Sequence, residues 1–131
     1  MRIFFDENLP EDVAEALNLL CKSRYPDIEI ISTKKAFGCG ISDEDLIPLI
    51  ANEKGILVSF DKGFTRKAVN YTQCTEQKVS IISVQLPKGL NCYWEIVKTL
   101  IKYWEKIMQE INSLTPPYCL KVTPRSLTRL N

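Results

Sequence analysis

The residues best suited to chemistry in this sequence are three aspartates, Asp6, Asp43 and Asp61. Asp6 follows an apolar run, Ile3 to Phe5, and Asp61 follows a second one, Ile56 to Phe60. In open sheets of parallel strands the ligand crevice lies outside the carboxyl ends of the strands, so an acid at such an end is placed for chemistry. Gathered carboxylates repel one another, and they persist only with a cation among them or with some of them protonated. We therefore predict that the three aspartates are the catalytic residues and metal ligands.

The metal expected at this site is a hard divalent cation. Oxygen ligands without His or Cys select Mg²⁺ or Mn²⁺ over zinc. One or two such ions would activate water and stabilise the leaving oxygen in phosphodiester cleavage. Glu7 is predicted as a further metal ligand. Without metal the carboxylates should repel one another, so replacing Asp6 or Asp61 by Asn is expected to preserve or raise the melting temperature.

Polar and positive residues beside the aspartates are the predicted substrate-binding residues, namely Asn8, Ser59, Lys62, Arg66 and Lys67. Positive side chains suit the phosphate backbone of a nucleic acid. Lys34 and Lys35 are expected on another side of the same site. The alternative is that these basic residues form an ordinary solvated surface.

Asp43 is expected on the buried face of a helix over residues 42–54. Ser42, followed by Asp45 three residues later, resembles a capping box at the start of this helix. At about 100° per residue, Asp43 projects onto the apolar stripe of the helix, whereas Glu44 and Asp45 fall to either side of it. The helix dipole favours acids in a first turn in general, which explains Glu44 and Asp45 better than it explains Asp43.

Composition excludes several classes of function. The chain contains no histidine, which excludes Ser-His-Asp and Cys-His catalysis and the usual zinc hydrolases. Its five cysteines are odd in number and form no C-x-x-C pair, which argues against disulfides and zinc and favours a cytoplasmic location. The net charge of +1 provides no global attraction to nucleic acid or membrane. We find no signal peptide and no run of about 18 apolar residues, so no membrane partner is expected.

At 131 residues the chain is expected to form one domain, residues 1–131. Strands are predicted after residue 2 and over 28–32, 56–60, 79–86 and 118–122, and helices over 10–22, 42–54, around 66–69 and over 92–114. Loops are predicted over 33–41 and 70–77, and residues 115–131, which contain no acid, are predicted to include a basic tail. The alternation of strands and helices predicts an α/β fold, a three-layer α/β/α sandwich with a mainly parallel central sheet.

The longest predicted helix, residues 92–114, has two interpretations. Apolar residues recur at three-and-four spacing, and Tyr93, Trp94 and Tyr103 widen the apolar face beyond one stripe. Such a helix is usually a core helix. The alternative is a surface for a homodimer or another partner.

Three motifs connect the aspartates with a known family. They are D-E-N-L-P from Asp6, S-D-E-D-L from Ser42, and I-L-V-S-F-D-K-G-F from Ile56. In order and spacing, over about the first 90 residues, they resemble the PIN-like domains grouped as short uncharacterised relatives of the VapC-type toxins of prokaryotes. The resemblance implies a PIN fold, a Mg²⁺- or Mn²⁺-dependent endoribonuclease acting on RNA, and a toxin role with a cognate antitoxin as partner. Asp6, Asp43 and Asp61 carry over by position.

The chain departs from the family pattern at two positions. Ser59 stands where Thr is common, and Gly63 stands where the family often has a further Asp. The second change removes a fourth carboxylate and bears on metal affinity.

Two other functions are open at this stage. The chain could be a non-catalytic PIN-like binding module that uses the long C-terminal helix and the basic tail, which predicts no metal dependence. It could also be a receiver-type phosphoacceptor, which needs a Lys at a later strand end. Lys88 is the candidate for that role, but this hypothesis leaves Asp43 unexplained.

Overall fold

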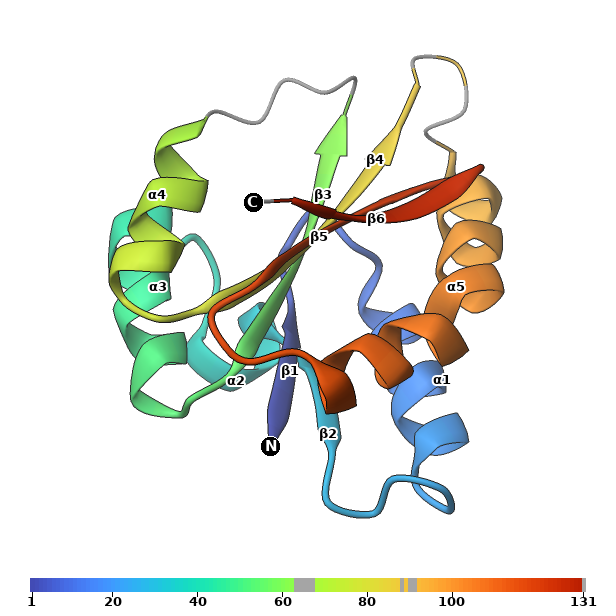
Figure 1. Ribbon diagram of the computed structural model, residues 1–131, viewed down its shortest axis with the longest axis horizontal. Coiled ribbons are helices and arrows are strands. Elements are labelled where there is room, and N and C mark those ends of the chain that lie inside the picture. The colour runs from blue at the N-terminus through green and yellow to red at the C-terminus, as the bar shows by residue number, and fades with distance from the viewer. Residues whose placement is uncertain (63–67, 88, 90–91, 131) are drawn as a thin grey trace.

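The computed structural model describes residues 1–62, 68–87, 89 and 92–130, and the side chains of residues 61, 62 and 68–71 lie outside that description. Strands and helices alternate along most of the chain (Figure 1). The elements are β1 (Arg2–Phe5), α1 (Glu11–Cys21), β2 (Glu29–Ser32), α2 (Thr33–Phe37), α3 (Asp43–Asn52), β3 (Ile56–Lys62), α4 (Ala68–Glu76), β4 (Ser80–Leu86), α5 (Tyr93–Ser113), β5 (Cys119–Thr123) and β6 (Ser126–Leu130).

The strands form one sheet in the order β2-β1-β3-β4-β5-β6. Strands β1 to β5 are parallel, and β6 runs antiparallel to β5. The predicted α/β class with a mainly parallel sheet is therefore confirmed. Within the sheet, β1 lies beside β3 with Phe5 opposite Val58. This register brings the residues that follow β1 next to the second half of β3.

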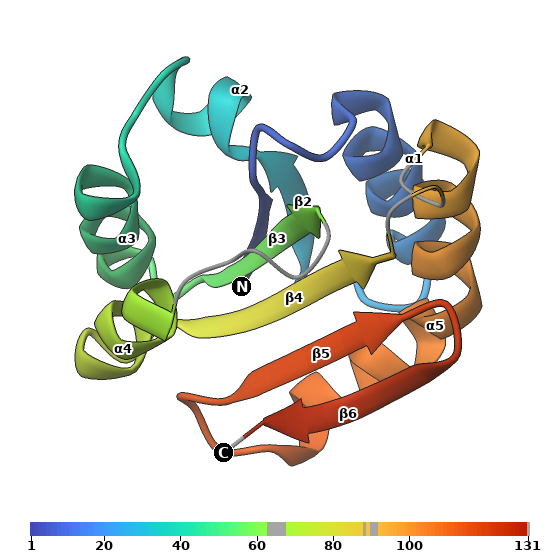
Figure 2. The same cartoon turned by 90° about the horizontal axis from the view of Figure 1, so that it is seen from above.

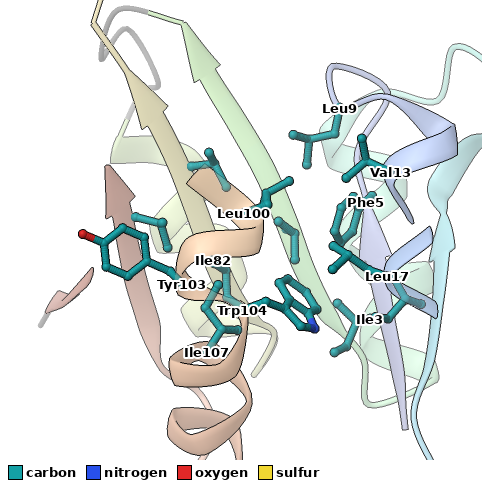
Figure 3. Close-up of a cluster of buried hydrophobic side chains, with 14 of the residues drawn as sticks. Ile3, Phe5, Leu9, Val13, Leu17, Ile82, Leu100, Tyr103, Trp104 and Ile107 are labelled. Carbon is teal, nitrogen blue, oxygen red and sulfur yellow. The ribbon is translucent and has the colours of Figure 1, made fainter. Parts of the chain in front are cut away.

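Helices cover both faces of the sheet and complete the three layers. Helices α1 and α5 lie on one face, and α2, α3 and α4 lie on the other (Figure 2). On the first face, Trp104 of α5 fills the space between that helix and β1 (Figure 3). Its ring centroid is 5.9 Å from that of Phe5, and its indole N–H donates to Sγ of Cys21 at 3.2 Å. The core interpretation of the long helix is confirmed, because eight of its residues are buried.

The second face has its own apolar cluster, built on Phe4 and Leu57 of the sheet and on the stripe of α3. The rings of Phe4 and Phe37 lie 5.1 Å apart. Gly55 permits this packing, because a Cβ built there would lie 2.6 Å from Cε2 of Phe4. A side chain at residue 55 is therefore excluded unless the core moves.

The predicted loop over 33–41 is wrong for its first half, which forms α2. Ser32 caps this short helix by accepting a hydrogen bond from the N–H of Lys35 at 3.1 Å. Ala36 and Phe37 pack against the second cluster. Tertiary packing stabilises a helix that is too short to be recognised by periodicity.

The predicted loop over 70–77 is also wrong, since most of it belongs to α4. Cys74 is 1% exposed and packs in the second cluster, so burial on the sheet stabilises a segment of polar sequence. The predicted final strand is confirmed as β5, but the basic tail contains the further strand β6. The Oγ1 of Thr123 accepts from the N–H of Ser126 at 3.1 Å in the turn between them. Arg129 of the tail pairs with Glu110 of α5 at 2.9 Å.

Candidate active site

Asp6 is a buried carboxylate held at the end of β1. Its residue is 7% exposed. Oδ1 accepts a hydrogen bond from the N–H of Asn8 at 2.9 Å, and Oδ2 accepts one from the N–H of Phe60 at 3.3 Å. The backbone N–H of Asp6 donates to the carbonyl of Val58 at 3.0 Å. These bonds to β3 fix the carboxylate against the neighbouring strand.

Asp6 and Asp43 line the same pocket, which has a volume of about 200 Å³. The other lining residues are Glu7, Asn8, Thr33, Gly38, Ile41 and Leu46. Asp43 is half-buried, whereas Glu44 and Asp45 are exposed, in agreement with the helical phase predicted for this turn. The Oγ of Ser42 accepts from the N–H of Asp45 at 3.3 Å, which confirms the predicted start of α3. The fold thus brings together two of the three aspartates, 37 positions apart in the sequence.

Glu7 joins this pocket to the loop that precedes α3. Its Oε1 accepts from the N–H of Gly40 at 2.7 Å. Gly38 and Gly40 both have positive φ, 99° and 71°, a conformation that favours glycine. The carboxylate of Glu7 therefore organises the loop in addition to lining the pocket.

A second pocket, of about 230 Å³, lies on the other side of Asp6 and Glu7. Glu11 and Lys34 line it, and Oε1 of Glu11 accepts from the hydroxyl of Ser32 at 2.9 Å. Glu11 was not predicted as a site residue, and its position in the first turn of α1 gives it no distinguishing signal in the sequence. Lys34 lies beside the acids as expected, whereas Lys35 lines a different pocket along α1 and β2.

Ser59 is a buried hydroxyl beside Asp6. Asp6 donates its backbone N–H to the carbonyl of Val58 and accepts a hydrogen bond from the N–H of Phe60, so Asp6 and Ser59 are neighbours across the strands. Ser59 is 0% exposed, and its Oγ has no hydrogen-bond partner in the described part of the chain. A buried polar atom without a partner costs about 1–3 kcal/mol, so its retention calls for an explanation such as a bound ion or water.

Polar residues continue from Ser59 into β4. Ser83 pairs with Ser59 across the sheet, and Nε2 of Gln85 donates to Oγ of Ser83 at 3.0 Å. Alternation along β4 places Ser83 and Gln85 on the same face as Ile81, which packs with α3 and α4. Neither residue was predicted as part of the site. Their signal was that they interrupt the apolar residues of a strand that is buried along its whole length.

The other predicted site residues lie partly or wholly outside the residues that the structure describes. Asp61 was expected just after its strand, but β3 continues through Lys62, and Asp61 pairs with Gln85. The side chains of Asp61 and Lys62 lie outside the described part of the chain. Arg66, Lys67, Gly63 and Lys88 are residues that the structure does not describe.

The side chains around Asp6 carry oxygen atoms, the donor type that hard divalent ions prefer. Pocket-lining Asp6, Glu7, Asn8 and Asp43 offer oxygen donors, and next to Asp6 lies the hydroxyl of Ser59, which has no partner among the described residues. Among the described residues, no group of three or more His, Cys, Asp or Glu side chains is close enough to hold a metal ion. The described part of the site therefore presents two aspartates, Asp6 and Asp43, and its third predicted ligand is Asp61.

Comparison with known proteins identifies the N-terminal two thirds of the chain. A family model described as a PIN like domain matches residues 1–85, which include β1 to β3, all of β4 but its last residue, and all three aspartates. No curated protein and no solved structure matches the chain. In the described residues, no helix has both the length and the apolar composition needed to cross a bilayer.

Proposed function

Since the chain belongs to the PIN-like domain family, we propose that it is a metal-dependent endoribonuclease with its active site at the ends of β1 and β3. The observation that supports this most directly is the shared pocket of Asp6 and Asp43, with the buried Ser59 hydroxyl beside Asp6. The proposed catalytic residues are Asp6, Asp43 and Asp61. The proposed cofactor is Mg²⁺ or Mn²⁺.

Each residue has a distinct role in this proposal. Asp6 is the most rigid ligand, because two backbone N–H groups and its own burial hold its carboxylate in place. Asp43 approaches from the first turn of α3, and Glu7 is a further ligand that also anchors the loop at Gly40. When bound, the divalent ion supplies Lewis acidity that stabilises negative charge on a phosphodiester undergoing hydrolysis.

Positive residues near the acids are proposed to hold the RNA backbone. Lys34 lines the second pocket beside Asp6 and Glu7. Lys62, Arg66 and Lys67 follow Asp61 in the sequence. Such residues bind phosphates without reading the base sequence, so their loss should weaken binding and its salt dependence without changing the metal requirement.

A toxin role in the cytoplasm, with a cognate antitoxin as partner, extends this proposal. It rests on the resemblance of the three acidic motifs to VapC-type toxins. Gly63, where relatives often have a further Asp, leaves this chain with one carboxylate fewer. We therefore expect weaker metal affinity than in a site with four acids.

The test is RNA cleavage by the parent, Asp43→Asn and Asp45→Asn proteins on one pool of single-stranded RNA. Asp45 is a matched control, because it lies in the same helical turn and undergoes the same change of charge but is exposed and does not line the pocket. Cleavage by the parent and by Asp45→Asn should need Mg²⁺ or Mn²⁺ and stop in EDTA. Asp43→Asn should lose activity by orders of magnitude.

Two outcomes would contradict the proposal. Equal cleavage by the parent and Asp43→Asn would indicate a contaminating nuclease. Absence of cleavage by the parent at saturating Mn²⁺, with no metal binding in calorimetry, would favour the non-catalytic binding module instead.

A further inference from the structure

Strand β6 leaves one edge of the sheet exposed. It is the last strand in the order, and among the described residues its partner in the sheet is β5. Figure 2 shows β6 at one margin of the sheet and β2 at the other. An exposed edge presents unpaired backbone N–H and C=O groups that can bind another strand.

The hairpin register identifies which backbone groups face outward. Thr123 pairs with Ser126 across the two-residue turn, and in a hairpin of this kind the pair that flanks the turn occupies a hydrogen-bonded position of the ladder. Alternation then directs the backbone groups of Thr128 and Leu130 toward β5, and those of Leu127 and Arg129 away from it. Within the described residues, no hydrogen bond from outside the hairpin reaches the backbone of residues 127–130.

By comparison, strand β2 at the opposite edge of the sheet is partly covered by the chain itself. The N–H of Ile30 in β2 donates to Oδ1 of Asn18 on α1 at 2.9 Å. Strand β2 is also short and leads directly into α2. Among the described residues, one outward N–H of β2 is therefore satisfied by a helix of the same chain, whereas no comparable contact reaches β6.

Strand β6 also lacks the features that usually prevent an edge strand from pairing with another chain. Residues 126–130 contain no proline, and their one charged residue is Arg129. The Nε and NH2 groups of Arg129 both lie 2.9 Å from Oε2 of Glu110, so its charge is already compensated. Thr128, at the centre of the strand, is exposed and uncharged.

We propose that β6 is a self-pairing edge, through which two copies of this chain form one continuous sheet. In antiparallel pairing about a two-fold axis at Thr128, Leu127 of each copy lies opposite Arg129 of the other, and the outward groups of both residues are satisfied. Thr128 lies opposite Thr128 of the second copy. The charges permit this arrangement, because in each copy the positive charge of Arg129 is already neutralised by Glu110 of the same copy.

The two-fold axis at Thr128 provides a specific test by sedimentation or light scattering. A pairing of five-residue strands buries little area, so dimerisation of the parent should increase with concentration. Thr128→Lys and Thr128→Glu each place like charges opposite one another, so each variant alone should be monomeric. A mixture of the two variants places Lys opposite Glu and should form a heterodimer.

Gln109→Lys, on the exposed surface of α5, is the control and should dimerise like the parent. Melting temperatures confirm that the variants are folded, which matters for Thr128→Lys because Thr128 is paired with Lys121 on β5. A parent that remains monomeric at its highest soluble concentration would overturn the proposal. Dimers of either single variant, or a monomeric mixture, would also overturn it.

Amide hydrogen exchange tests the register independently. The N–H groups of Leu127 and Arg129 should exchange fast in dilute protein and become protected as concentration rises. The N–H of Thr128 should be protected at all concentrations, because it bonds to β5 within each copy. Protection of Leu127 and Arg129 that does not depend on concentration would contradict self-pairing.

Discussion

The carboxylate of Asp6 accepts a hydrogen bond from the backbone N–H of Phe60, a residue 54 positions later in the chain, at 3.3 Å. The other oxygen of the carboxylate accepts from the N–H of Asn8 at 2.9 Å. The charge of Asp6 is therefore compensated partly by the backbone. Repulsion among the aspartates alone predicted a preserved or raised melting temperature for Asp6→Asn. These hydrogen bonds reverse that prediction, because they stabilise the carboxylate of Asp6 in the folded protein.

Asp6→Asn should lower the free energy of unfolding by about 1–3 kcal/mol in metal-free buffer. An Asn amide can accept one of the two N–H bonds, but its NH2 group then faces the other N–H. The measurement is urea unfolding of the parent, Asp6→Asn and the control Asp45→Asn. A variant as stable as the parent would show that carboxylate repulsion outweighs the two hydrogen bonds.

Mn²⁺ should raise the melting temperature of the parent and of Asp45→Asn, but not of Asp43→Asn. A ligand stabilises only the state that binds it, by about 2.7 kcal/mol when its concentration is about 100 times its Kd. The comparison is made by differential scanning calorimetry with and without EDTA. An equal shift in all three proteins would mean that Mn²⁺ binds away from the pocket of Asp6 and Asp43.

Gly55→Ala should destabilise the protein by about 1–3 kcal/mol, the usual cost of overpacking a core. The new methyl group would lie 2.6 Å from Cε2 of Phe4 and 3.2 Å from the carbonyl oxygen of Arg2. Phe4→Leu should relieve part of this collision, so the double variant should be more stable than the sum of the two single effects predicts. Strict additivity in urea unfolding would exclude a direct contact.

The protein should lose stability between pH 9 and 11 in a manner that depends on Cys119. Burial raises the pKa of the Cys119 thiol from 9.0 to about 11, because the thiolate is disfavoured in the folded protein. Stability from the neutral thiol is therefore fully present below pH 9 and is lost as the pH rises through about 11. Burial likewise raises the pKa of Tyr118 from 10.0 to about 12, so its contribution is lost at higher pH.

Cys119→Ala isolates the thiol. In urea unfolding between pH 8 and 11, the parent should lose more stability than Cys119→Ala does. Parallel pH profiles for the two proteins would show that the thiol ionises equally in the folded and unfolded states.

The sequence by itself determined the local features of this protein. Consecutive apolar residues in Ile3–Phe5 and Ile56–Val58 predicted buried strands, and the resulting α/β sandwich is confirmed. Three-and-four spacing predicted the long helix α5, and capping by Ser42 predicted the start of α3. The phase of α3 also predicted that Asp43, and not Asp45, faces inward. These features depend on near neighbours in the chain, which is why periodicity and capping rules could find them.

Only the tertiary structure decided the features that depend on distant contacts. Helices α2 and α4 form because Phe37 and Cys74 pack on the sheet, although neither segment has a strong helical pattern of its own. Strand β6 exists because the hairpin folds back on β5, and Arg129 finds Glu110 on α5. The neighbours of Asp6 in space, Ser59 and the polar residues of β4 beyond it, follow from strand order and register. A pattern of residue types specifies which face a side chain occupies, but which strand lies beside it is decided by packing of the whole sheet.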